Sequence, residues 1–170
     1  GIGSVGFRVA EYLARAGARL IRCDHPDYPA LLRDIDDAPP VIWVRGDPAC
    51  LSRPQVALVG ARNASSLGLR MAAGMSRALA EAGRTVTAGL ARGIDTAAHE
   101  ASCAAGTIAV LAGGIDRIYP AENRALAERI RATAARWWSC GVSHAASPGN
   151  VSVCPSSWYD RSTSELNRRL

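Results

Sequence analysis

Residues 56–95 constrain the fold of this chain more than any other segment, because they hold two short apolar runs that each end at a glycine. The first run, Val56–Val59, stops at Gly60 and passes through small polar residues into a stretch with helical spacing. Such a strand–loop–helix unit directs backbone N–H groups and the positive end of a helix dipole at the same point. The segment therefore predicts a binding site for a phosphate-bearing ligand.

Strands and helices alternate along the chain on both sides of this loop. We expect strands at Val41–Val44, Val56–Val59, Thr85–Thr87 and Thr107–Leu111. We expect helices at Leu67–Ala82, Ile94–Ala104 and Ala121–Ile130. Short glycine-bearing loops between such elements predict an α/β fold, a Rossmann-like parallel sheet with helices on both faces. Because the carboxyl ends of parallel strands share one edge of a sheet, the loops at Gly60, Gly89 and Gly113 should form one site.

The chain divides into three parts. Residues 1–50 hold a helix over Val5–Ala16 and a proline-rich connector, and residues 51–131 hold the Rossmann-like core. Residues 132–170 form an atypical tail that is rich in serine and shows no helical or strand period, so we expect it to have low order. We also expect the parallel sheet to keep an uncovered edge where later strands would pair.

The pair Trp137-Trp138 offers an explanation for the tail. Tryptophan has a single codon, so the neighbouring reading frame can be deduced: one base earlier, the two codons encode an apolar residue followed by valine. Those residues would begin a buried strand. We interpret the tail as the product of a reading-frame shift, with a genuine low-order tail as the alternative.

Composition narrows the function. The net charge is +5 and all 20 basic residues are arginine, which binds phosphate with two donors and stacks on bases. Without lysine the chain cannot form a Walker phosphate loop, and none of the expected strands is followed by the Gly-x-Gly-x-x-Gly motif of dinucleotide-binding proteins. Five cysteines without a Cys-x-x-Cys pair argue against a disulfide framework or a zinc site. We expect no cofactor, no metal and no membrane span, and a cytoplasmic location.

The first loop carries the strongest candidates for phosphate binding. Gly60 and Ala61 allow close approach of the backbone, and Arg62 adds a charged fork of donors. Ser65 or Ser66 should cap the following helix and contact the same phosphate.

The second loop, Gly89–Asp95, comes next. Gly89 and Gly93 bracket a tight turn that contains Arg92. Asp95 should cap the following helix, with orientation of Arg62 or Arg92 as the alternative role.

Four further residues complete the set of candidates. Gly113 and Gly114 end the next strand and leave room for a ligand, and Tyr119 either stacks on a base or packs against a helix. His99 lacks partners for catalysis, so we expect a hydrogen-bonded structural histidine and no catalytic residues.

Ordered motifs over residues 20–131 resemble the DNA-processing protein A family (DprA, also called Smf). The segments that carry the resemblance are Pro39–Gly46, Val-Ala-Leu-Val-Gly-Ala-Arg-Asn-Ala-Ser at 56–65, Gly-Leu-Ala-Arg-Gly-Ile-Asp-Thr-Ala-Ala-His at 89–99, Thr107–Pro120 and Glu122-Asn123. The family's phosphate motif corresponds to Gly60, Ala61 and Arg62. A second motif corresponds to residues 88–95, where Ala88 stands in place of the usual serine.

The resemblance implies an extended Rossmann-like fold that binds single-stranded DNA without being an enzyme. It implies a role in natural transformation, with a RecA-type recombinase as the partner that is loaded onto DNA. Family members continue with strands that complete the sheet and a dimer surface. This chain resembles a truncated member, so a homodimer would need the missing half, and truncation could leave the protein inactive.

A related enzyme class is the alternative. Nucleotide phosphoribohydrolases that resemble lysine decarboxylases share the fold and also bind phosphate. They carry a Pro-Gly-Gly-x-Gly-Thr loop followed by a glutamate, and this chain has no such loop.

Overall fold

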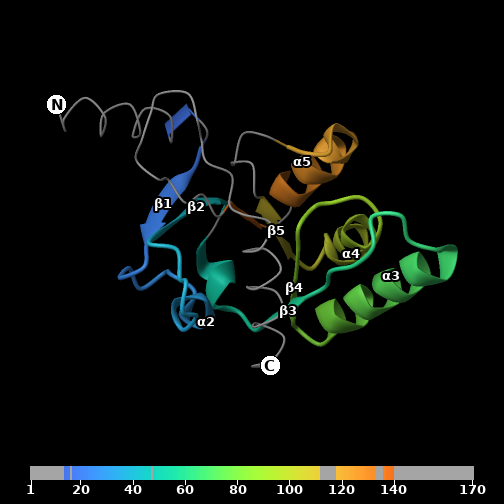
Figure 1. Cartoon of the computed structure of the whole chain (residues 1–170), viewed down its shortest axis with the longest axis horizontal. Coiled ribbons are helices and arrows are strands. Elements are labelled where there is room, and N and C mark those ends of the chain that lie inside the picture. Colours follow the sequence, from blue (N-terminus) through green and yellow to red (C-terminus); the bar gives the residue numbers. More distant parts are fainter. Residues whose placement is uncertain (1–13, 16, 47, 112–117, 133–135, 140–170) are drawn as a thin grey trace.

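A computed structural model describes residues 14–15, 17–46, 48–111, 118–132 and 136–139 (Figure 1). The strands form one six-stranded sheet in the order β1-β2-β6-β5-β4-β3. Their bounds are β1 Arg19–Arg22, β2 Val41–Arg45, β3 Gln55–Ala57, β4 Thr85–Ala88, β5 Thr107–Leu111 and β6 Arg136–Ser139. The helices are α2 Ala30–Arg33, α3 Ser66–Glu81, α4 Ile94–Ser102 and α5 Arg124–Ala132, with 3-10 turns η1 Pro48–Ser52 and η2 Ala121–Asn123.

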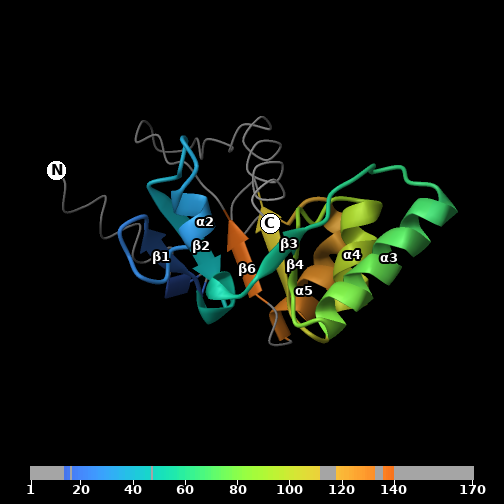
Figure 2. The ribbon, with the colours of Figure 1, turned by 90° about the horizontal axis from the view of Figure 1, so that it is seen from below.

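The four strands from β3 to β6 are parallel and follow one another in chain order across the sheet. Each right-handed crossover between such neighbours places its helix on the same face. Helices α3, α4 and α5 accordingly lie side by side on one side of the sheet (Figure 2). Every residue of the inner strand β4 is buried, as expected for a parallel strand that is covered on both faces.

Strand β5 separates two hydrophobic clusters. Ile108 packs with Ile42 and Val44 of β2 and with residues of α2 and η1. Its neighbour Ala109 points to the other face and packs with Ile130 of α5. The short helix α2 therefore covers the face opposite α5, and the Rossmann-like α/β class predicted from the sequence is confirmed.

Differences from the predicted elements lie mainly at their ends. Strand β3 stops at Ala57, two residues early, and the last helix begins as the 3-10 turn η2 before α5 starts at Arg124. Strand β1 was not predicted. Only Ile21 of its four residues is buried, so no alternation of apolar and polar residues marks it. The expected helix over Val5–Ala16 lies almost entirely outside the described residues.

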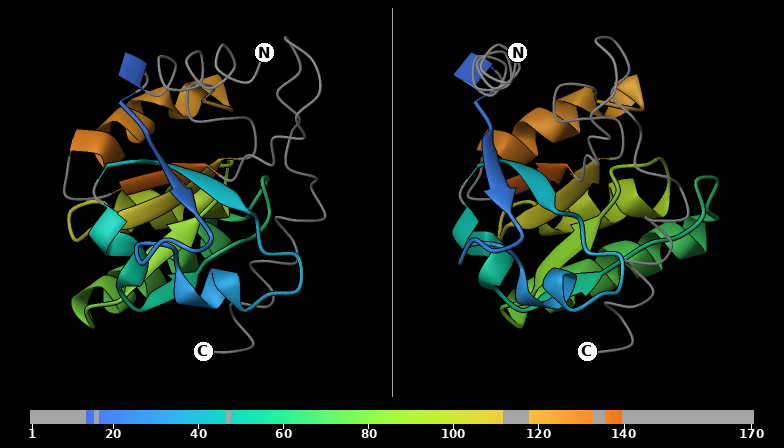
Figure 3. Two further views of the ribbon diagram at one scale, coloured as in Figure 1. Left: turned by 90° about the vertical axis from the view of Figure 1, so that its left-hand side faces the viewer. Right: turned by 60° about the vertical axis from the view of Figure 1, so that its left-hand side comes forward.

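One correction concerns the segment after Arg131, for which the sequence predicts no strand. Strand β6 lies there, between β2 and β5 (Figure 3). Trp138 is paired in parallel with Val110 of β5 and antiparallel with Val44 of β2. Tryptophan favours strands, but four residues are too few to show a period. Residues 140–170 lie outside the described part, and the division into three parts and the frame shift remain predictions.

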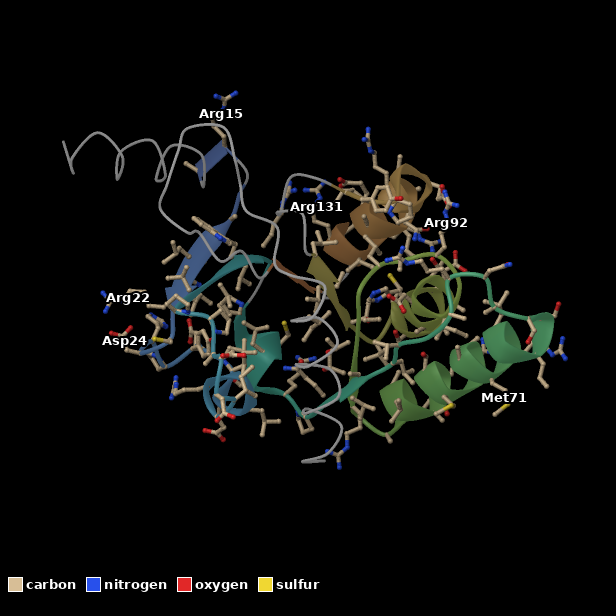
Figure 4. The ribbon with its side chains drawn as sticks, in the orientation of Figure 1. Arg15, Arg22, Asp24, Met71, Arg92 and Arg131 are labelled. Atoms are coloured by element: carbon tan, nitrogen blue, oxygen red, sulfur yellow. The ribbon has the colours of Figure 1, made fainter. Side chains whose placement is uncertain are left out.

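The uncovered edge of the sheet also lies elsewhere than expected. Strand β6 pairs with β5, so within the described residues the open edge of the parallel half belongs to β3. Helix α3, which packs against α4 and β4, exposes an apolar stripe of Leu67, Met71 and Met75, whose exposed fractions are 62%, 56% and 49%. Met71 points away from α4 into solvent (Figure 4). No helix among the described residues is long and apolar enough to cross a bilayer.

Candidate anion-binding site

The first two loops meet through their backbones at the carboxyl ends of β3 and β4. The N–H of Ile94 donates to the carbonyl of Ala61 over 3.3 Å. Gly93 has φ of +76°, and a Cβ atom there would lie 2.7 Å from the carbonyl oxygen of Arg62. No side chain fits in that space, so Gly93 lets the loop that carries Arg62 rest directly on the start of α4.

Gly60 is also required for packing. A Cβ atom at this position would lie 2.7 Å from Cγ1 of Ile94, the first residue of α4. The absence of a side chain therefore lets the loop after β3 pack against the start of α4. The sequence predicts a glycine here for close approach to a ligand, and the structure shows a close approach between the two loops.

Asp95 is buried and holds the second loop closed. Its Oδ2 atom accepts hydrogen bonds from the N–H groups of Gly89, at 3.0 Å, and Ala91, at 3.3 Å. Between them Leu90 is buried with φ of 62°. The prediction that Asp95 caps α4 is wrong, because the N-cap is Gly93 and has no side-chain cap hydrogen bond. Asp95 lies inside the first turn, where its carboxylate reaches back to the loop.

Asn123 ties the third loop to the second, a role that the sequence does not reveal. Its side-chain amide donates to the carbonyl of Leu90 at 2.8 Å and to Oγ1 of Thr96 at 2.9 Å. Thr96 in turn donates to the carbonyl of Ala91 at 2.7 Å. The only sequence signal was its place in the Glu122-Asn123 motif, since a buried asparagine cannot be distinguished from a surface one by periodicity.

The charged side chains of the site are exposed. Arg92 donates to Oε2 of Glu122 at 2.9 Å, and the two side chains are 61% and 53% exposed, so this ion pair adds little stability. Arg62 is exposed and has no acidic partner within the described residues. The guanidinium of Arg62 is therefore available to an anion from outside.

The cap of α3 agrees with the sequence. Oγ of Ser65 accepts a hydrogen bond from the N–H of Gly68 at 3.2 Å, which confirms Ser65 as the N-cap. Ser66 is the first residue of the helix and is exposed. Residues 60–63 and both serines are accessible, so the positive end of the α3 dipole faces solvent beside Arg62.

His99 is a structural residue, as predicted. Its ring is fully buried, and Nδ1 lies 2.8 Å from Oγ1 of Thr107, which donates its own proton to the carbonyl of Val86. Nδ1 is therefore the donor. Burial lowers the pKa of His99 to about 4, and the Ala88 backbone opposes this shift more weakly. Nε2 has no hydrogen bond of normal geometry within the described part of the chain.

The remaining candidates have different outcomes. Gly113 and Gly114 lie outside the described residues. Tyr119 is 77% exposed, so packing against a helix is wrong and stacking on a base remains a prediction. Within the residues described, no group of three His, Cys, Asp or Glu side chains is placed to hold a metal ion.

A protein-family model matches the part of the chain that contains these loops. The model of DNA recombination-mediator protein A matches residues 19–137. This chain belongs to the DNA recombination-mediator protein A family. The match confirms the family resemblance that the motifs predicted, and it extends from β1 into β6.

Individual relatives agree with this assignment. The chain is 35% identical over 126 residues to DNA processing protein DprA of Bacillus subtilis (strain 168), covering 72% of this chain and 42% of that protein. The crystal structure of DNA processing protein A from Streptococcus pneumoniae superposes with a TM-score of 0.69 at 28% identity, covering 92% of this chain and 53% of the other.

A second solved structure shares the fold. It is DNA processing protein A from Helicobacter pylori, a protein with a single-stranded DNA binding mode, and it superposes with a TM-score of 0.67 at 22% identity. The alignment covers 85% of this chain and 62% of that one. These members of the DNA recombination-mediator protein A family are longer, and the chain spans about two fifths of the length of the B. subtilis relative.

Proposed function

We propose that this chain binds single-stranded DNA, without sequence preference, at the loops after β3 and β4. The observation that carries the proposal is the exposed Arg62, which has no acidic partner within the described residues and lies on a loop that Gly93 fixes against α4. A loop backbone that is already held in place loses little conformational entropy on binding, and the start of α3 adds a favourable dipole. The single-stranded DNA binding mode of the H. pylori protein supports this choice of ligand.

The candidate residues divide into two groups under this proposal. The single-stranded DNA contacts the exposed groups, which are Ala61, Arg62, Ser65, Ser66 and Arg92. Buried or closely packed groups shape the loops, and these are Gly60, Gly89, Gly93 and Asp95. The N–H groups of Gly89 and Ala91 are already bonded to Asp95, so they serve the loop and not the phosphate. Gly113 and Gly114 complete the proposed set.

The test is binding of a labelled oligothymidylate, followed by fluorescence anisotropy over a range of salt concentrations. Log K should fall with log salt with a slope of about −2, as about three phosphate contacts on a single strand give. Arg62→Ala should weaken binding by about 1–3 kcal/mol, and by the same amount for every base composition.

Arg84→Ala is the matched control for charge. Arg84 is exposed and directly precedes β4, so it lies at the opposite edge of the sheet. This variant should bind as the parent does. An Arg62→Ala protein with parental affinity, or an affinity that salt does not change, would contradict the proposed site.

The wider role follows from the family. We propose a function in natural transformation and in loading a RecA-type recombinase, which would take place in the cytoplasm, and a homodimer only for the longer relatives. We propose no enzymatic activity. Asp95 and His99 are the buried acid and base nearest the loops, and both are engaged in hydrogen bonds that hold the fold.

A further inference from the structure

A groove with a volume of about 510 Å³ runs between α3 and α4, which lie next to each other in Figure 1. Small side chains, Ala73, Ala97 and Ala101, line it together with Leu69, so its surface is apolar. Charged side chains line it as well, namely Arg70, Arg77 and Glu100. The groove thus combines an apolar lining with two arginines from the same helix.

One end of the groove is continuous with the proposed DNA site. Gly93 and Thr96 line it there, and Gly93 is the residue whose backbone touches the loop of Arg62. Single-stranded DNA that is bound at Arg62 and continues along α3 would therefore enter the groove directly. The direction of α3 places Arg62, Arg70 and Arg77 in order along this path.

The charges of the groove favour an anion. Arg70 and Arg77 are seven residues apart, so they share a face of α3 and are separated by about 10.5 Å along the helix axis. Both are exposed, and neither has an acidic partner within the described residues. Glu100 is paired with Arg129 at 3.6 Å, so an arginine offsets its charge. Two unpaired guanidinium groups beside an apolar surface match phosphates with sugars or bases packed between them.

We propose that the α3–α4 groove is a second stretch of the DNA path, in which Arg70 and Arg77 bind phosphates downstream of Arg62. This inference rests on the proposed function, because only a polymeric ligand such as single-stranded DNA would extend from Arg62 into the groove. It predicts that Arg70 and Arg77 matter only for strands long enough to reach them.

The test compares oligothymidylates of about 5 and about 20 nucleotides with the double variant Arg70→Ala/Arg77→Ala. For the long strand we expect affinity to fall about tenfold and the salt slope to lose about 1.4, the value for two phosphate contacts. The short strand should bind within about twofold of the parent protein. Arg53→Ala/Arg84→Ala removes the same charge outside the groove and should leave both strands unaffected.

A second variant should raise the affinity for DNA. Damage to the fold would lower that affinity, so a rise cannot be explained by misfolding. Glu100→Gln removes the acid from the groove and should strengthen binding of the long strand about twofold. Circular dichroism should show the same helix content in all variants, because each replaced residue is exposed.

Each result decides between the two proposals. If Arg62→Ala weakens both strands but the double variant weakens neither, the groove is not part of the path and the proposed function stands. Failure of the parent to bind either strand would overturn both. Loss of affinity in the double variant for a polyglutamate peptide of equal charge would show a groove for acidic polymers in general, and would overturn its assignment to DNA.

Discussion

Replacing Gly93 with alanine should destabilise the protein, because the added methyl group would overlap the backbone of the loop that carries Arg62. The new Cβ atom would lie 2.7 Å and 2.9 Å from the carbonyl oxygen and carbon of Arg62, and it would meet the carbonyl oxygen of Ala61 as well. These are backbone atoms, so no rotamer change can relieve the contact. A non-glycine residue at φ of +76° and ψ of −121° adds conformational strain.

The magnitude has two parts. A residue held in a sparsely populated backbone region costs about 1–3 kcal/mol. Separation of the loops also removes the hydrogen bond from Ile94 to Ala61, which contributes about 0.5–1.5 kcal/mol. We therefore expect Gly93→Ala to lower the free energy of unfolding by about 2–4 kcal/mol.

Gly74 provides a matched control, because the same substitution there should have the opposite sign. It lies in the middle of α3, and a Cβ atom would find nothing within 4 Å. Gly74→Ala should raise the free energy of unfolding by about 0.5–1 kcal/mol, through the better helix propensity of alanine. Urea unfolding followed by circular dichroism measures both. A Gly93→Ala protein within about 0.5 kcal/mol of the parent would refute the argument that backbone contact fixes the loops.

Three further predictions concern other parts of the molecule. Burial lowers the pKa of His99 in the folded protein to about 4, so between that pH and the usual value of 6.5 the unfolded chain binds a proton that the folded chain does not. Stability from this group is therefore lost as pH falls from 6.5 to about 4, by about 3 kcal/mol, and His99→Asn should flatten the dependence of the unfolding free energy on pH over that range. Met71→Glu should raise solubility, measured by light scattering, without lowering the unfolding free energy, because it places a charge in the exposed stripe of α3. The chain should not hydrolyse nucleoside monophosphates, so turnover of AMP that Asp95→Asn abolishes would favour the phosphoribohydrolase alternative.

Periodicity predicted the elements whose residues alternate between environments. Helices α3 and α4 and strands β4 and β5 follow patterns long enough, or buried enough, to be recognised from the sequence. Strand β1 buries one residue, and β6 has only four, so both depend on neighbours distant in the chain. Pairing between distant segments is not encoded in local spacing.

The site shows the same limit. Capping by Ser65 and the structural role of His99 depend on nearby residues and could be predicted. The bonds from Asp95 back to Gly89 and from Asn123 to Leu90 depend on how the loops fold over each other. Residue type gives the capacity for a hydrogen bond, but the partner is set by tertiary structure.

The position of β6 has a consequence for the order of assembly. In the described sheet, the β1–β2 pair is hydrogen-bonded to the parallel strands through β6, and Val44 pairs with Trp138, which lies almost at the end of the described residues. During synthesis, β2 and β5 would face each other across the space of one missing strand until residue 139 leaves the ribosome. Pairing of such distant segments closes a long loop and is slow. Strand β6 is therefore the step that joins the β1–β2 pair and the strands β3 to β5 into one sheet. Substitutions in β6 should lower the rate of folding more than they change ligand binding at the site.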